Sequence, residues 1–184
     1  MTPGRTMPFL MPVRIQSFLR KEDETLVPIQ EWDAVIADPD YLEGALELTV
    51  NGVPLISPVM WDYIDELWAY IITTLRELVS DGTSYTYFPD QPIKLEMEKT
   101  SSGMVKVSIS SRSGKFNNST QISEDRLVLP LLDEGEQFFL KMQELEPEGQ
   151  NHYEGEIKRI KSFRSGYKNC GTDDLNLPRE LTEE

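Results

Sequence analysis

The sequence has little cysteine and histidine, with one residue of each among its 184 residues. A single cysteine, Cys170, excludes an intramolecular disulfide, the bond that stabilises many small secreted domains. His152 and Cys170 together cannot supply the set of nitrogen and sulfur ligands that a typical zinc site requires. We therefore expect a protein of a reducing compartment that works without a metal or other cofactor.

Long hydrophobic runs are also absent. The most apolar stretch, residues 68–78, contains Arg76 and Glu77 and is far shorter than the roughly 20 residues of a membrane-spanning helix. Near the start of the chain, Pro8 and Pro12 interrupt the apolar residues, and no small-residue cleavage site follows them, which argues against a secretory leader. These features predict a cytoplasmic protein without a membrane partner.

Basic residues are scarce relative to acidic ones. Lysine and arginine number 18 and aspartate and glutamate 32, so the formal net charge is -14. Most of the excess lies in residues 22–98, which hold two basic and seventeen acidic side chains. An acidic surface repels nucleic-acid phosphates and favours a basic protein as partner, although it can also serve only to keep the protein in solution.

No recognisable catalytic motif is present. The sequence lacks a glycine-rich phosphate loop and a G-x-S-x-G nucleophile turn, and His152, beside Tyr153, is typical of a surface residue. We therefore predict no catalytic residue, and no enzyme. The alternative is an enzyme that uses paired carboxylates, because 32 acidic residues form such pairs by chance.

The first half of the chain shows clear strand and helix patterns. Apolar residues alternate on both sides of Asn51-Gly52, which predicts a hairpin over residues 46–56. Ser57 and Pro58 are typical of a helix start, and Asp81-Gly82 of a helix end, so we expect a helix over 58–80. Its apolar face recurs every three or four residues, at Trp61, Ile64, Trp68, Ile71, Leu75 and Leu78.

The second half continues as strands and then helices. Residues 85–88, closed by prolines, predict an edge strand or turn, and alternating strands follow at 93–97 and 105–109, with a short third strand near 120–122. A second helix is expected over 130–146, weakened by Gly135, and a short third helix around Tyr153 to Ile160. Residues 166–184 predict a disordered acidic tail. The fold expected for residues 1–165 is one α+β domain, an antiparallel sheet packed by one long and one or two shorter helices.

Four residues are candidates for partner binding. Trp32 lies between Glu31 and Asp33 in a polar segment, and exposed aromatics surrounded by charge often anchor protein interfaces. Asp62, Asp65 and Glu66 lie away from the apolar face of the predicted helix and form either a solvated face or a docking face for a cationic partner. Trp61 and Trp68, on the apolar face, are interpreted as core.

The order of segments resembles that of small immunity proteins of bacterial polymorphic toxin systems. The resemblance covers about residues 44–145 and consists of LELTVNGVPLI, the helix with Trp61 and Trp68, YFPDQP, IKLEME, MVKVSIS and LLDEGEQFFLKM. It implies a non-enzymatic protein that binds and blocks a basic toxin domain, and it carries over no functional residue. A third hypothesis, besides binding and catalysis, is that the protein is a structural component of a larger complex. This hypothesis predicts a large exposed apolar patch.

Overall fold

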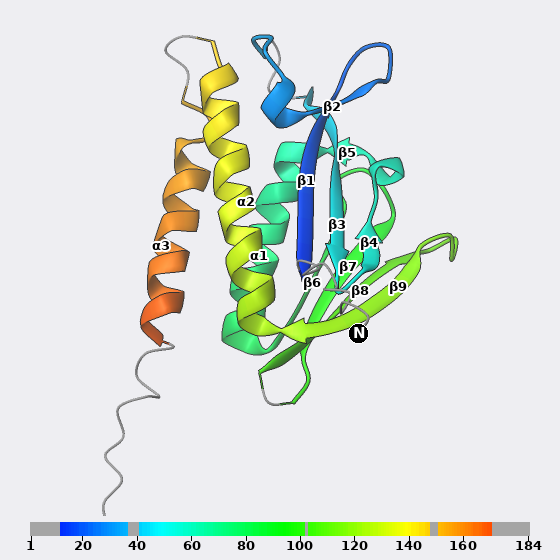
Figure 1. Cartoon of the computed structure of the whole chain (residues 1–184), viewed down its shortest axis with the longest axis vertical. Coiled ribbons are helices and arrows are strands. Elements are labelled where there is room, and N and C mark those ends of the chain that lie inside the picture. Colours follow the sequence, from blue (N-terminus) through cyan, green and yellow to red (C-terminus); the bar gives the residue numbers. More distant parts are fainter. Residues whose placement is uncertain (1–11, 37–40, 102, 148–150, 171–184) are drawn as a thin grey trace, which may run out of the picture.

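The computed structural model describes residues 12–36, 41–101, 103–147 and 151–170, and within them the chain has the predicted α+β fold. The strands form two antiparallel sheets, and three helices pack beside them (Figure 1). The elements, in chain order, are β1 (Val13–Arg20), β2 (Leu26–Pro28), β3 (Glu43–Val50), β4 (Val53–Ile56), β5 (Asp62–Tyr63), α1 (Ile64–Asp81), β6 (Thr83–Tyr87), β7 (Ile93–Lys99), β8 (Met104–Ser111), β9 (Asn117–Ser123), α2 (Glu124–Leu145) and α3 (Glu154–Cys170).

The first sheet has the order β2-β1-β3-β4, with β5 pairing with the start of β3. The predicted hairpin is confirmed as β3 and β4, joined at Asn51 and Gly52, whose φ angles of 49° and 79° allow a tight turn. Gly44 is required where β3 passes under α1, because a Cβ at this position would lie 2.3 Å from the carbonyl oxygen of Phe18. β1 was not anticipated from the sequence.

The second sheet has the order β6-β7-β8-β9 and confirms the predicted meander. Ile93, Leu95 and Met97 are buried while the residues between them are more exposed, which is the alternation of a sheet with one wet face. β6 is an edge strand, as the flanking prolines predicted. β9 is longer than the expected strand at 120–122, because the polar residues from Asn117 onward continue to pair with β8.

The core lies where α1 and α2 meet the two sheets. Trp68 is its largest fully buried side chain, packs against Phe138 of α2 and donates an indole hydrogen bond to Ser17 of β1 at 3.0 Å. This confirms Trp68 as a core residue. α3 lies against α2, on the outside of the helix layer (Figure 1).

The first helix begins six residues later than the predicted range of 58–80. Pro58–Met60 form a single 3-10 turn, and Asp62 and Tyr63 then pair with β3, so the α-helix starts only at Ile64. Trp61 stands three residues before Ile64, as on a helix face, but this spacing arises by chance. Trp61 consequently lies outside the helix and is partly exposed, which contradicts its assignment to the core.

The second helix begins at Glu124 instead of residue 130 and includes both Pro130 and Gly135. Proline ordinarily interrupts a helix, but here the buried side chains on both sides of it keep the helix continuous. Gly135 has a packing role, because a Cβ there would lie 3.0 Å from Ile72 and 3.3 Å from Trp68. The absence of a side chain therefore allows α1 and α2 to approach closely.

The predicted boundary of the tail at residue 166 is wrong. α3 continues through Cys170, and Tyr167 is half-buried against the core, with its hydroxyl donating to Asp125 Oδ1 at 2.7 Å. The helix extends because Phe163 and Tyr167, one turn apart, continue the apolar side of Ile157 and Ile160. The remainder of the predicted tail, residues 171–184, lies outside the described residues.

Candidate partner-binding surface

Asp62 is buried, with only 2% of the residue exposed, and so does not lie on the solvated helix face that the sequence predicted. Its Oδ1 accepts hydrogen bonds from the backbone N–H groups of Tyr63 and Asp90 at 2.8 and 3.1 Å, and its Oδ2 accepts one from Gln91 at 3.0 Å. A carboxylate that accepts several backbone N–H groups fixes the segments that carry them. Asp62 therefore joins β5 to the loop after β6.

Three aromatic side chains surround this junction at the surface, and we call them the aromatic patch: Tyr41, Trp61 and Tyr63. Tyr41 is 70% exposed and Trp61 38% exposed, whereas Tyr63 is half-buried. The rings of Tyr41 and Tyr63 meet edge to face, with centroids 6.3 Å apart. Large aromatic side chains held on a fixed backbone are the usual anchors of protein interfaces.

Arg20, at the end of β1, supports one face of Trp61. Its guanidinium lies 4.1 Å from the ring centroid, and it also forms ion pairs with Glu43 and Glu24. Because two carboxylates neutralise this cation, the aromatic patch carries no net positive charge from Arg20. The side chain amide of Gln91 donates to the Trp61 carbonyl oxygen, which links the tryptophan to the loop that Asp62 holds.

The surroundings of the patch are acidic. Desolvation, followed by the nearby charges of Asp90 and Glu43, raises the pKa of the Tyr63 phenol above its ordinary value, so the hydroxyl stays a neutral hydrogen-bond donor. Asp90 is exposed, and Glu43 is half-buried. A surface of this kind offers aromatic faces and carboxylates, both of which attract cationic side chains.

Asp65 and Glu66 lie one turn further along, on α1, and face α3. Together with His152, Tyr153 and Glu156 they line a hollow of about 230 Å³. Asp65 Oδ2 accepts a hydrogen bond from the Tyr153 hydroxyl at 3.3 Å, and burial raises the pKa of the Asp65 carboxyl. Asp65 thus mainly links α1 to the turn that precedes α3, whereas Glu66 is exposed, as predicted.

His152 and Trp32 have local partners. His152 is exposed, as expected, and its Nδ1 lies 2.9 Å from Glu146 Oε1. Trp32 is half-buried against the core, and its indole N–H donates to the carbonyl oxygen of Ala34 at 2.9 Å. Part of the Trp32 ring is therefore committed to packing. It remains a candidate anchor only through its exposed part.

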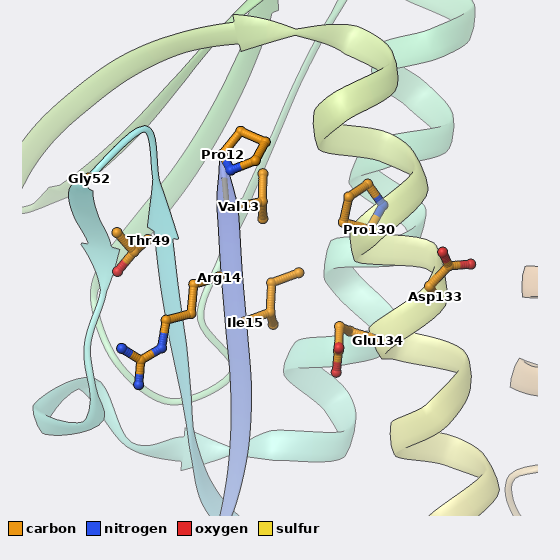
Figure 2. A pocket seen from close by; sticks show the side chains of 9 residues that line it. All are labelled: Pro12, Val13, Arg14, Ile15, Thr49, Gly52, Pro130, Asp133 and Glu134. Carbon is orange, nitrogen blue, oxygen red and sulfur yellow. The ribbon is translucent and has the colours of Figure 1, made fainter. Parts of the chain in front are cut away.

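A larger hollow lies elsewhere, between β1 and α2. This β1 cleft has a volume of about 740 Å³ and is shown in Figure 2. Val13, Ile15 and Pro130 form its apolar part. Asp133 and Glu134 line the cleft from α2, and Arg14 lines it from β1. Burial, and then repulsion from Asp133, raises the pKa of the Glu134 carboxyl.

Of the four candidate residues, the structure brings together only Asp65 and Glu66, which line the same hollow. Asp62 and Asp65 have structural partners, Glu66 is exposed and accepts a hydrogen bond from the Tyr70 hydroxyl at 3.2 Å, and Trp32 comes from a separate segment. Sequence reasoning missed the aromatic patch. The available signal was the clustering of Tyr41, Trp61 and Tyr63 around acidic residues within a short stretch of chain.

Comparisons with known proteins give no relative: no family model, no curated protein and no solved structure matches the chain. Among the described residues, no helix is long and apolar enough to cross a membrane. The same residues contain no group of three or more histidine, cysteine, aspartate or glutamate side chains arranged to hold a metal ion.

Proposed function

We propose that this chain is a non-enzymatic protein-binding domain that docks a basic partner protein on the aromatic patch. The observation that carries the proposal is the exposure of Trp61 directly before Asp62, whose buried carboxylate fixes this segment to the loop at Gln91, with the exposed Tyr41 ring against Tyr63. An aromatic side chain held in place loses little conformational entropy when a partner covers it. The patch therefore suits an anchor role better than a flexible loop would.

The acidic surroundings favour a basic partner. Arg20 covers one face of Trp61 and is neutralised by Glu43 and Glu24, so the exposed Tyr41 ring and the carboxylate of Asp90 are open to lysine or arginine side chains. Cation–π contacts contribute about 0.5–2 kcal/mol each, depending on how far they are desolvated. The net charge of -14 adds long-range attraction that accelerates the encounter.

The finer form of this proposal is a cytoplasmic immunity protein that neutralises a basic toxin domain. It is supported by the order of segments over residues 44–145, by the acidic excess in residues 22–98, and by an aromatic patch suited to protein contact. An inhibitor that covers the active site of a basic nuclease-type domain presents negative charge in the place of the nucleic-acid substrate. The patch, with the exposed Asp90 carboxylate beside it, offers that combination.

The test begins with partners recovered from the cells that produce the protein. The wild-type chain and the Trp61→Ala variant are used as baits side by side, and bound proteins are compared quantitatively. We expect a basic protein that is retained by the wild type and depleted at least about tenfold with Trp61→Ala, since an anchor residue contributes 2 kcal/mol or more. Tyr85→Ala, which removes an exposed aromatic ring from β6, is the matched control and should leave retention unchanged.

Two results would overturn the proposal. One is a specific partner that is itself acidic. The other is a partner retained equally by the wild type and by Trp61→Ala, which would show that the aromatic patch is not the docking surface. If the partner is basic and inhibits cell growth when produced alone, the immunity form of the proposal is supported; a basic partner without toxicity would reject that finer form only.

A further inference from the structure

One edge of β1 is only partly paired. β2 pairs with Phe18, Leu19 and Arg20 alone, so among the described residues no strand lies beside residues 13–17 on that side. β3 covers the other side of β1 along its length. An unpaired strand edge presents a row of backbone donors and acceptors that a further strand can use.

The direction of the unused groups follows from the hydrogen-bond pattern. The carbonyl oxygen of Pro12 accepts from the N–H of Asn51 at 2.7 Å, so this pair bonds toward β3. In antiparallel strands the bonding residues alternate, which directs the backbone groups of Arg14 and Gln16 toward β3 as well. The backbone groups of Val13 and Ile15 therefore point to the open edge. The backbone groups of Leu19 point the same way, and there they meet β2.

The β1 cleft lies at this same edge. Its volume of about 740 Å³ falls within the range of ligand sites, and Val13 and Ile15 line it from β1 while Pro130 faces them from α2 (Figure 2). Asp133 and Glu134 stand on the α2 side, but Asp133 already pairs with Arg164 at 3.0 Å. Glu134 forms no ion pair with any other described residue, and its carboxyl is partly desolvated.

We propose that the β1 cleft binds an extended segment of a partner protein, which adds a strand to the open edge of β1. The backbone of the segment pairs with Val13 and Ile15, an apolar side chain enters between Ile15 and Pro130, and a lysine or arginine reaches Glu134. This mode gives affinity through main-chain hydrogen bonds and selectivity through alternate side chains. The free N–H and C=O groups of β1 repeat at the spacing of an extended strand. An extended peptide carries its own N–H and C=O groups at the same spacing, so the two rows can pair.

The site is distinct from the aromatic patch. Arg20, which supports Trp61, is at the opposite end of β1, about 23 Å from Val13 at the rise of an extended strand. The inference therefore does not rest on the proposed function. A partner could use either surface, and the experiment below separates them.

The probe is a fluorescent six-residue peptide, threonine-valine-threonine-lysine-threonine-valine, titrated against the full chain; its valines and lysine lie two residues apart and therefore share the face of the added strand that meets α2. We expect saturable binding, with amide hydrogen exchange at Val13 and Ile15 slowed at least about tenfold, since each new hydrogen bond protects its own N–H. Exchange at Arg14 and Gln16, already paired with β3, should not change. Protection without this alternation, or no binding at millimolar peptide, would overturn the proposal.

Variants of the peptide and of the protein sharpen the result. The same peptide with methylated backbone nitrogens on the residues that face β1 should bind about tenfold or more weakly, because it cannot donate to the strand edge. Glu134→Lys should weaken binding about tenfold, whereas Glu77→Lys, which makes the same charge change on an exposed site of α1, should have a much smaller effect.

Two further arms exclude other occupants. Trp61→Ala should leave peptide binding unchanged, and a loss with this variant would show that the peptide docks on the aromatic patch instead. A chain that lacks residues 1–11 should bind the peptide as the full chain does. If its affinity rises more than about tenfold, the start of the chain itself occupies the cleft, and the proposal of a partner segment is overturned.

Discussion

At the scale of single residues, Asp62 determines how the aromatic patch is held. Its carboxylate satisfies the backbone N–H groups of Tyr63, Asp90 and Gln91, and all three lose their partner in Asp62→Ala. Unsatisfied backbone donors in a partly buried site cost about 1–3 kcal/mol each, so we expect a loss of about 3 kcal/mol or more in the free energy of unfolding. Chemical denaturation measures it. Asp90→Ala, which removes only an exposed side chain, should change stability by less than about 0.5 kcal/mol.

Trp61 and Trp68 have opposite roles although they lie seven residues apart. Trp68 is fully buried, so Trp68→Ala should lower the free energy of unfolding by about 3–5 kcal/mol. Trp61→Ala loses mainly the stacking of Arg20 and should cost about 1 kcal/mol or less. Unfolding curves of both variants test the difference. A cost below about 1 kcal/mol for Trp68→Ala would contradict its place in the core.

Asp65 gives the protein a pH-dependent contribution of known sign. Burial raises its pKa in the folded state above the ordinary value of 3.8, so folding favours the protonated form. This contribution is fully present below the pKa of the unfolded chain and is lost as the pH rises through the folded pKa. Asp65→Asn stays neutral. We therefore expect wild type to lose stability relative to Asp65→Asn as the pH rises above the ordinary value of 3.8, as measured by urea unfolding; a constant difference would contradict the burial of this carboxyl.

At the scale of elements, α3 contributes to the fold beyond residue 165. Tyr167 packs beside Phe163 and donates to Asp125, so ending the chain after Ser165 should cost about 1–2 kcal/mol in the free energy of unfolding. Tyr167→Ala in the full chain should reproduce most of this loss. Thermal and chemical unfolding of the two variants provide the measurement. A truncated chain as stable as the wild type would restore the earlier expectation of an unpacked tail.

An element could be predicted when the sequence pattern that determines it lies within the element itself. The β3–β4 hairpin and the β7–β8 meander were predictable because alternation and turn residues lie within each segment. β1 was missed because its inward side includes Ser17, whose partner Trp68 is 51 residues away. The early start of α2 was missed because Pro130 and Gly135 argue against a helix, and only close packing with α1 explains the glycine.

The candidate site was less predictable for the same reason. Helical spacing placed Trp61 and Asp62 on a helix, and nothing within the segment indicated that this stretch pairs with β3. Asp62 is fixed by backbone groups 28 and 29 residues away, a relation that periodicity does not contain. By contrast, the exposure of Glu66 and His152 was predicted correctly, since both follow from their immediate sequence surroundings.

At the scale of the whole molecule, the central claim is that an acidic surface with exposed aromatics docks a basic protein. The charge is concentrated in the first half of the chain, which also carries the aromatic patch. Attraction between opposite charges accelerates the encounter and is screened over a Debye length of about 8–10 Å at physiological salt. An anchoring aromatic ring acts instead on the lifetime of the complex. The two contributions are therefore separable by kinetics.

The most direct test measures association and dissociation rates with the purified basic partner at low and high salt. We predict that association slows about tenfold or more at high salt, that neutralising Glu66 and Asp90 together slows it further at low salt, and that Trp61→Ala mainly speeds dissociation. Neutralising Glu77 and Asp81, two exposed acids at the other end of α1, is the matched control and should have a smaller effect. Rates indifferent to salt and to Glu66 and Asp90, together with an unchanged lifetime in Trp61→Ala, would contradict the claim.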